Sequence, residues 1–303
     1  MTFCLKRHKE LQTEEYEMEI VTPMFLGGAE EVNRRIRSAS LKGMLRFWWR
    51  AVYGPSFPSI SEMKAEEDKI FGSTEYKSKV DIHVLSSNDL RTGKGLPQHN
   101  IPGGRTEVFR YLRFGASNDN NYLKPGSKFK LRVRCSSEKY LDQVKLSLHC
   151  MCNFGGLGSK SRNGFGCIDC PELSIEFKPS SNAPQEYTAF SKKSMLFKDK
   201  EQDSWEKALG RIGQFYVEAR KSIKPTEDRK YIAKPLPQKG ITNERYAKPY
   251  FLHVNKLESG KFQGQVLFLP SDRGQKNREA KEYEKVLNSV NEYFAKKMRE
   301  ATL

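Results

Sequence analysis

Long apolar runs are missing from this 303-residue sequence. No stretch approaches the roughly 18 consecutive apolar residues that a membrane-spanning helix requires. The first ten residues, MTFCLKRHKE, lack the apolar core of a signal peptide. No heptad, short repeat or low-complexity tract is present, so the sequence does not predict a coiled coil or a repeat array. We therefore expect a cytoplasmic protein that has no membrane partner.

Acidic residues are also scarce relative to basic ones. The chain has 37 Asp and Glu against 53 Lys and Arg, which gives a formal net charge of +16 and a pI of about 9.5. A hydrophobic content of 37% is enough for real cores, and the length makes two domains the natural expectation. Such an excess of positive charge favours an anionic polymer as the partner.

Cysteine is present at only six positions, and a cytosolic chain should keep these thiols reduced. Four of them form two pairs, Cys150-x-Cys152 and Cys167-x-x-Cys170. Zinc ligands usually come as two C-x₂₋₄-C pairs, and C-x-C at a helix end points its side chains to different faces. We expect buried thiols, no metal and no cofactor, with zinc as the alternative.

Hydrophobic periodicity predicts an α+β fold made of two ferredoxin-like (RRM-like) domains in tandem. The first domain, 1–178, reads β-α-β-β-α-β with insertions, and an acidic helix at 61–71 is expected to be a solvent-facing insertion. The second domain, 185–303, is less regular and follows the linker 179–184. The elements of the first domain are strands at 12–25, 79–87, 109–114, 128–135 and 168–177, and helices at 38–53 and 137–151. Those of the second are helices at 203–222 and 275–299 and strands at 250–254 and 265–269.

The helix at 38–53 carries a row of positive charges. Lys42, Arg46 and Arg50 are spaced four apart, and the helix contains no acidic residue. The spacing places them on one face, where three unpaired cations would suit a phosphate backbone, although a solvated face remains the alternative. A basic arm precedes this helix and is also a candidate for RNA contact: Arg34, Arg35 and Arg37.

A glycine-rich stretch, NFGGLGSKSRNGFG at 153–166, lies between a predicted helix and a predicted strand. It does not fit the P-loop, which needs Gly-Lys-Ser/Thr after a strand, and Ser161 stands where the dinucleotide fingerprint requires its third glycine. Glycine permits close backbone approach, so the loop could expose amides and two cations to phosphate. The candidate contacts are Gly155, Gly156, Gly158, Lys160, Ser161, Arg162, Gly164 and Gly166.

Two motifs carry a resemblance to a known family. The loop GGLGSKSRNGFG resembles the glycine-rich loop of the CRISPR RAMP (repeat-associated mysterious protein) superfamily. The stretch IVTPMFLGG followed by SLKGMLRFWWRAVYG, within 20–54, resembles the RAMP subunits of the type III-B (Cmr) interference module. The resemblance covers the first half of the chain, and it implies the same ferredoxin-like fold.

The resemblance implies a non-catalytic, RNA-binding subunit of a Cmr-type effector complex. Its partners would be guide RNA, toward the 3′ part of the guide, target RNA and other Cmr-type RAMP subunits. The alternative is a metal-independent RAMP endoribonuclease that processes CRISPR RNA. That chemistry needs a base within reach of a ribose 2′-OH, for which His99 and His149 are the candidates.

Overall fold

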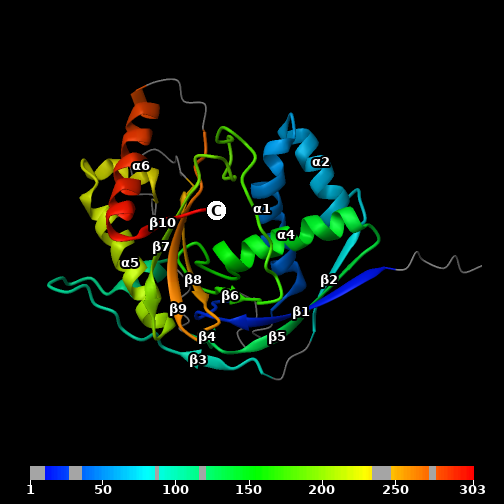
Figure 1. The fold of residues 1–303 in the computed structure, drawn as a ribbon, viewed down its shortest axis with the longest axis horizontal. Coiled ribbons are helices and arrows are strands. Elements are labelled where there is room, and N and C mark those ends of the chain that lie inside the picture. The colour runs from blue at the N-terminus through cyan, green and yellow to red at the C-terminus, as the bar shows by residue number, and fades with distance from the viewer. Residues whose placement is uncertain (1–10, 27–35, 86–88, 116–120, 234–246, 273–277) are drawn as a thin grey trace, which may run out of the picture.

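The computed structural model describes residues 11–26, 36–85, 89–115, 121–233, 247–272 and 278–303. The first half forms a four-stranded antiparallel sheet in the order β2-β5-β1-β6. Helices α1 and α4 lie together on one side of it (Figure 1). The bounds of these elements are β1 Gln12–Ile20, α1 Ser38–Tyr53, β2 Val80–Leu85, β5 Lys128–Cys135, α4 Glu138–Phe154 and β6 Ile168–Asp169.

Strand β1 shows why the sequence forms this sheet. Tyr16, Met18 and Ile20 alternate toward the core and are buried, as period-two patterning requires. The intervening glutamates lie opposite basic residues of β5 in the strand register. Three cross-strand ion pairs result: Glu15–Arg132 at 2.6 Å, Glu17–Lys130 at 3.3 Å and Glu19–Lys128 at 4.0 Å. The predicted half-buried strand is therefore confirmed.

The second half forms another four-stranded antiparallel sheet, in the order β10-β7-β9-β8. Helices α5 and α6 cover one of its faces, and the helices of the first half lie beyond the other face (Figure 1). The bounds are β7 Met195–Gln202, α5 Trp205–Ser222, β8 Tyr250–Lys256, β9 Phe262–Phe268, α6 Arg278–Lys297 and β10 Arg299–Ala301. The α+β class is confirmed.

Strands β8 and β9 of the second sheet are buried on both faces, and this links the two halves. In β8, Phe251 packs in the cluster that contains Trp48 and Leu148, whereas Leu252 and Val254 pack with the residues of α5 and α6. The Phe251 ring centre lies 5.6 Å from that of Trp48 in α1. The hydrophobic cores are therefore shared between the halves, because one face of the second sheet rests on the helices of the first.

The remaining elements lie outside the two four-stranded sheets and their four main helices. They are η1 Gly54–Ser56, α2 Ile60–Phe71, β3 Thr92–Lys94, α3 Val108–Arg113, β4 Asn121–Leu123 and η2 Thr226–Tyr231. Strands β3 and β4 pair as a two-stranded sheet. Within the described residues, no helix combines the length and the apolar character needed to cross a membrane.

Several element predictions were wrong. Residues 109–114 are not a strand, because Glu107 caps helix α3 by accepting the amides of Phe109 and Arg110. The predicted strand 168–177 is reduced to the two residues of β6, since Pro171 two positions later has no amide to donate to a strand ladder. The edge strand β10 and the central strand β7 were missed. The predicted helices at 38–53, 137–151, 203–222 and 275–299 are confirmed within a few residues.

Candidate nucleic-acid interface

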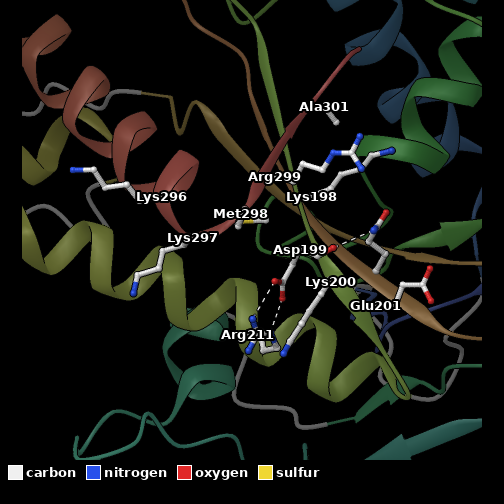
Figure 2. Close-up of a pocket in the computed structure, with 11 residues that line it drawn as sticks. Lys198, Asp199, Lys200, Glu201, Arg211, Lys296, Lys297, Met298, Arg299 and Ala301 are labelled. Atoms are coloured by element: carbon white, nitrogen blue, oxygen red, sulfur yellow. Dashed lines mark hydrogen bonds and ion pairs between the residues drawn. The ribbon is translucent and has the colours of Figure 1, made fainter.

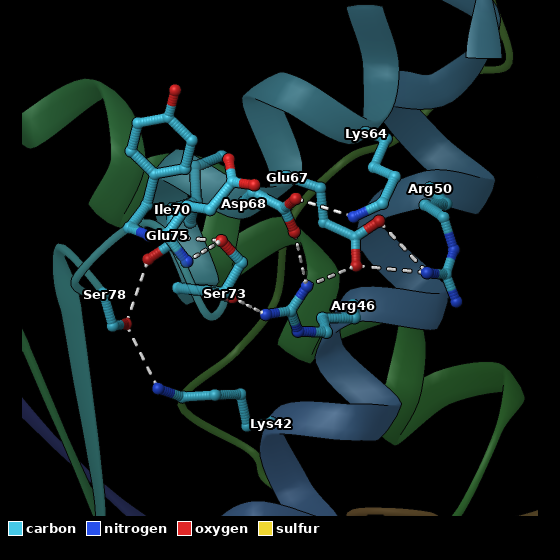
Figure 3. Close-up of polar contacts among 12 residues, drawn as sticks. Lys42, Arg46, Arg50, Lys64, Glu67, Asp68, Ile70, Ser73, Glu75 and Ser78 are labelled. Atoms are coloured by element: carbon cyan, nitrogen blue, oxygen red, sulfur yellow. Dashed lines mark hydrogen bonds and ion pairs between the residues drawn. The ribbon is translucent and has the colours of Figure 1, made fainter. Parts of the chain in front are cut away.

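The cationic row of α1 is not unpaired. Arg46 Nη1 lies 2.8 Å from Glu67 Oε1 and 3.4 Å from Asp68 Oδ1, and both acids come from α2 (Figure 3). Arg50 Nη1 lies 3.0 Å from the other oxygen of Glu67. The Glu67 side chain is only 5% exposed, so the acidic helix is packed against α1 on this side. The expectations of three unpaired cations and of a purely solvent-facing α2 were both wrong, because the neutralising charge comes from the next helix.

The remaining contacts of the row point to the same structural role. Arg46 also donates to the carbonyl of Gly72 at the end of α2, and its guanidinium lies 5.6 Å from the centre of the Phe71 ring. Lys42 Nζ donates to Ser78 Oγ at 3.1 Å. Burial lowers the pKa of Lys42, and the nearby Arg46 charge adds to this effect. The cationic row of α1 therefore stabilises the packing of α2, and of the segment after it, against α1.

The glycines of the loop at 155–166 pack against the protein itself. A Cβ on Gly158 would lie 2.4 Å from the carbonyl oxygen of Phe25, and one on Gly164 would lie 2.3 Å from Leu209 Cδ1. A Cβ on Gly155 would meet Trp48, and one on Gly156 would meet the backbone of Gly166. The close approach that was expected toward phosphate is thus made by neighbouring protein groups.

Backbone hydrogen bonds fix the same loop in place. Ser159 N donates to Phe25 O at 2.7 Å, and Gly166 N donates to Pro23 O at 2.9 Å. On the other side, Leu252 N of β8 donates to Arg162 O at 3.2 Å. The loop therefore joins the segment after β1 to strand β8 of the second sheet.

Arg162 is part of this junction. Its guanidinium lies 5.0 Å from the ring centre of Phe47 in α1 and 4.7 Å from that of Phe251 in β8. Its Nη1 donates to Lys248 O at 3.2 Å. Burial lowers the pKa of the Arg162 guanidinium. A cation stacked between aromatic rings of both halves stabilises their contact.

The other predicted residues differ in their surroundings. Lys160 has a positive φ of 63° and a half-buried side chain, and it lines a cavity together with Asn163. Ser161 is half-buried, and its carbonyl accepts the amide of Gly164. Arg37 is exposed at the start of α1. Arg34 and Arg35 lie outside the described residues.

The sequence did not indicate a second cationic surface, which lies on the second sheet. A cavity of about 880 Å³ is lined there by residues of β7, α5 and β10 and of the end of α6 (Figure 2). Lys198 of β7 stands directly opposite Arg299 of β10 in the strand register. In the described part of the chain, neither of these two cations forms an ion pair with an acidic side chain. The basic residues that line this cavity are Lys198, Lys200, Arg211, Lys296, Lys297 and Arg299.

The acids at this cavity leave most of its positive charge uncompensated. Asp199 forms an ion pair with Arg211. The Nε and Nη2 atoms of Arg211 lie 2.6 Å and 3.1 Å from the two carboxylate oxygens of Asp199. Glu201 lies at the rim, 4.0 Å from Lys261. Like charges directly opposite each other on paired strands destabilise a sheet. The Lys198–Arg299 pair is therefore costly unless an anion lies between the two groups.

The predicted burial of the four clustered cysteines is confirmed. Burial raises the pKa of Cys170 to about 12 and that of Cys150 above the usual range. Cys167 differs, because the adjacent His253 holds its pKa below the ordinary value despite burial. Among the described residues, no three His, Cys, Asp or Glu side chains are grouped so that they could hold a metal ion.

The two candidate bases for ribonuclease chemistry are packed against the protein. His149 Nδ1 lies 2.9 Å from Leu173 O and 3.2 Å from Asn153 Nδ2. His99 packs on the Phe109 ring and closely against Gly210 of α5. Burial lowers the pKa of both imidazoles.

The sequence model of the RAMP superfamily, a protein family, matches residues 17–169, which is half of the chain. The chain belongs to the RAMP superfamily. Among curated relatives, it is 30% identical over 173 residues to the CRISPR system Cmr subunit Cmr1-2 of Pyrococcus furiosus, covering 50% of this chain and 92% of that subunit. It is 28% identical over 282 residues to Cmr1-1 of the same organism, covering 90% of this chain and 75% of that one.

Solved structures show the same RAMP fold. The crystal structure of Cmr1 from Pyrococcus furiosus matches with a TM-score of 0.62 at 19% identity, over 96% of this chain and 98% of that one. A chain in the cryo-EM structure of the type III-B Cmr-beta complex bound to cognate target RNA matches with a TM-score of 0.56 at 14% identity. That match covers 94% of this chain and 100% of the other. The resemblance deduced from the two sequence motifs is therefore confirmed.

Proposed function

We propose that this chain is a non-catalytic, RNA-binding subunit of a type III-B CRISPR (Cmr) RNA-targeting effector complex. Its partners would be guide RNA, toward the guide 3′ end, target RNA and other Cmr-type RAMP subunits. Membership of the RAMP superfamily supports this role, as does similarity over 92% of the length of one Cmr1 subunit. The net charge of +16 fits a protein that neutralises RNA phosphates.

The proposal includes two ferredoxin-like units in tandem, divided as 1–178 and 185–303. Each unit runs β-α-β-β-α-β once η1, α2, β3, α3, β4 and η2 are set aside. In both sheets, the first and third of these strands lie in the centre and the second and fourth lie at the edges. This repetition supports two units of the same fold. The second sheet packs against the helices of the first unit.

The observation that carries the RNA-binding proposal is the like-charge pair of Lys198 and Arg299. Two cations opposite each other across paired strands, at the wall of a basic cavity, are explained by an anionic ligand that bridges them (Figure 2). Of the residues predicted from sequence, Lys160 is retained because its side chain lines a cavity. Arg46, Arg50 and Arg162 have protein partners that a phosphate would have to displace, and their role in RNA binding stays a prediction.

The geometry gives the endoribonuclease alternative no specific support. A general base must come within hydrogen-bond reach of the 2′-OH, and the ring atom Nδ1 of His149 already contacts a backbone carbonyl. We expect no RNA cleavage by the purified protein with or without magnesium. Turnover that a single change such as His99→Ala or His149→Ala abolishes would favour the nuclease instead.

Co-purification tests the complex directly. The tagged chain is recovered from its native cell, and any bound RNA is sequenced. Short RNAs that share a repeat-derived tag, together with other RAMP subunits, are the expected result. Recovery of the chain without RNA would contradict the proposal.

A salt titration tests the cationic surface. Binding of single-stranded RNA is measured for the wild type and for the double variant Lys198→Gln, Arg299→Gln. If each cation neutralises one phosphate, the slope of log K against log salt becomes shallower by about 1.4. The matched control, Lys64→Gln with Lys69→Gln, removes two α2 cations that are paired with acids on the same helix, and it should leave the slope unchanged. Equal slopes for all three proteins would remove this surface from the RNA path.

A further inference from the structure

A second cavity, of about 670 Å³, opens at the junction of the two halves. Its walls come from α3 and the residues around it, the tip of the glycine loop, α5, and Ala233 and Lys248. We call it the junction cavity. Five cations and one acid line it: Arg105, Arg110, Lys160, Arg220, Lys248 and Glu107.

The single acid does not neutralise these cations. The Glu107 carboxylate accepts the backbone amides of His99 and Phe109, each at about 3 Å, and that of Arg110. It is thus committed to capping α3. Among the described residues, none of the five cations forms an ion pair. Arg220 donates to two neutral acceptors, Tyr111 Oη and Ala233 O, each at 3.0 Å. The junction cavity therefore carries a positive charge that the described part of the protein does not balance.

Lys248 is subject both to burial and to the charge of its neighbours. Its Nζ donates to Asn163 Oδ1 at 2.6 Å and to Arg162 O at 3.1 Å, and lies 3.9 Å from the centre of the Tyr216 ring. Burial and then the neighbouring Arg162, Arg220 and Lys160 hold the pKa of Lys248 well below its ordinary value. An anion in the cavity would relieve this repulsion.

A second, independent feature also indicates a missing ligand. Tyr216 of α5 lines the junction cavity and is only 3% exposed. Its buried hydroxyl has no hydrogen-bond partner among the described residues. A buried hydroxyl without a partner costs free energy, and a ligand oxygen would satisfy it.

An aromatic ring completes the site. Phe114, directly after α3, lines the same cavity, and its side chain is 57% exposed. Exposed aromatic rings beside cationic grooves serve as stacking surfaces for bases of single-stranded nucleic acid. The combination of phosphate-binding cations and a stacking ring matches a nucleotide unit.

We propose that the junction cavity binds one phosphate group of single-stranded RNA between Lys160, Lys248 and Arg220, with an adjacent base stacked on Phe114. The Tyr216 hydroxyl donates to the same phosphate. This inference rests on the proposed function and assigns a site to it. The second half is thereby part of the RNA path, and the site exists only when both halves are packed together.

The sharpest test compares two tyrosines. Tyr216→Phe removes a hydroxyl without a partner, so the melting temperature should stay the same or rise, while affinity for a fluorescein-labelled oligo-uridylate falls about 2- to 10-fold. The control is Tyr250→Phe, whose buried hydroxyl donates to Asn291 Oδ1 at 2.9 Å and to Leu287 O at 3.3 Å. That variant should melt about 2–4 °C lower and bind RNA as the wild type does.

A charge variant provides a second readout. Lys160→Met should weaken binding of the same RNA and make the salt slope shallower by up to about 0.7, whereas Tyr216→Phe should leave the slope unchanged. Wild-type affinity and slope in both variants would overturn the junction site but leave the proposed function standing. Absence of RNA binding by the wild type would refute the proposed function.

Binding of a mononucleotide then distinguishes RNA from a free nucleotide as the source of the phosphate. Uridine 5′-monophosphate should raise the melting temperature of the wild type less than oligo-uridylate does, and it should not raise that of Lys160→Met. Equal stabilisation of both proteins would refute a phosphate site in the cavity. If the wild type binds only the mononucleotide, the cavity is a free-nucleotide site and the RNA assignment is wrong.

Discussion

Glu67 forms ion pairs with two arginines at once, so its removal should be among the more destabilising single changes on α2. Glu67→Gln keeps the size of the side chain and removes the charge that lies 2.8 Å from Arg46 and 3.0 Å from Arg50. Both guanidiniums would then face each other across a neutral amide. Asp68, at 3.4 Å from Arg46, compensates only part of the loss.

The expected magnitude follows from the burial of the three groups. Breaking a fully buried ion pair by removing one partner costs about 3–5 kcal/mol. Here the acid is 5% exposed, but Arg46 is 24% and Arg50 38% exposed, so water screens part of the penalty. We therefore expect a loss of about 2–3 kcal/mol in the free energy of unfolding, which for a chain of this length corresponds to a melting temperature lower by about 3–5 °C.

Thermal and urea unfolding of the full chain measure this loss. The control is Glu75→Gln, an exposed carboxylate in the segment after α2, which should change stability by less than about 0.5 kcal/mol. RNA binding is measured on the same proteins below their melting range. If Glu67→Gln were as stable as Glu75→Gln and bound RNA more tightly, the α1 row would belong to the RNA surface after all.

Two further predictions concern the junction. Gly166→Ala places a Cβ 2.0 Å from Leu157 O, whereas Gly103 has nearly the same φ, +69° against +68°, with nothing within 4 Å of an added Cβ. In thermal unfolding, Gly166→Ala should therefore cost about 1–3 kcal/mol more than Gly103→Ala, and equal losses would contradict the packing role of the loop. The pKa of Lys248 is lower in the folded protein than in the unfolded chain, where it is about 10.5. Between the folded and the unfolded pKa the unfolded chain binds more protons, so the free energy of unfolding rises with pH in this window. Urea unfolding of Lys248→Met should lack this contribution, and parallel pH profiles for variant and wild type would contradict it.

The parts that sequence predicted well are those where local pattern and burial agree. Strand β1 alternates because its glutamates meet basic residues of β5 while Tyr16 and Met18 enter the core. Helix α1 follows from its apolar face, which includes the buried Trp48 and Trp49. Strand β8 was also predicted, at 250–254, although it is buried on both faces and has no alternation. Helix α3 was mistaken for a strand because its six residues are too few to separate the helix period from the strand period.

The sequence singled out the glycine loop, but its glycines serve a different physical purpose from the one predicted. The prediction took glycine as a sign of backbone approach to phosphate. In the structure the approach is to Phe25, Trp48, Leu157 and Leu209, so the glycines allow the loop to fit between the two halves. Sequence alone cannot separate these cases, since both need residues without a side chain.

The sequence also predicted the wrong set of unpaired cations, for a related reason. Whether a basic side chain can bind an anion depends on which residues the fold places beside it. Lys42, Arg46 and Arg50 form a regular row in sequence, yet two of them are neutralised by α2. Lys198 and Arg299 lie far apart in sequence with no pattern between them, yet the sheet places them opposite each other without a counter-ion among the described residues. The same holds in the junction cavity, where Lys160 and Lys248 meet only because the second sheet packs on the first unit. An anion-binding surface is therefore better sought where tertiary packing leaves like charges together than where a helix merely repeats them.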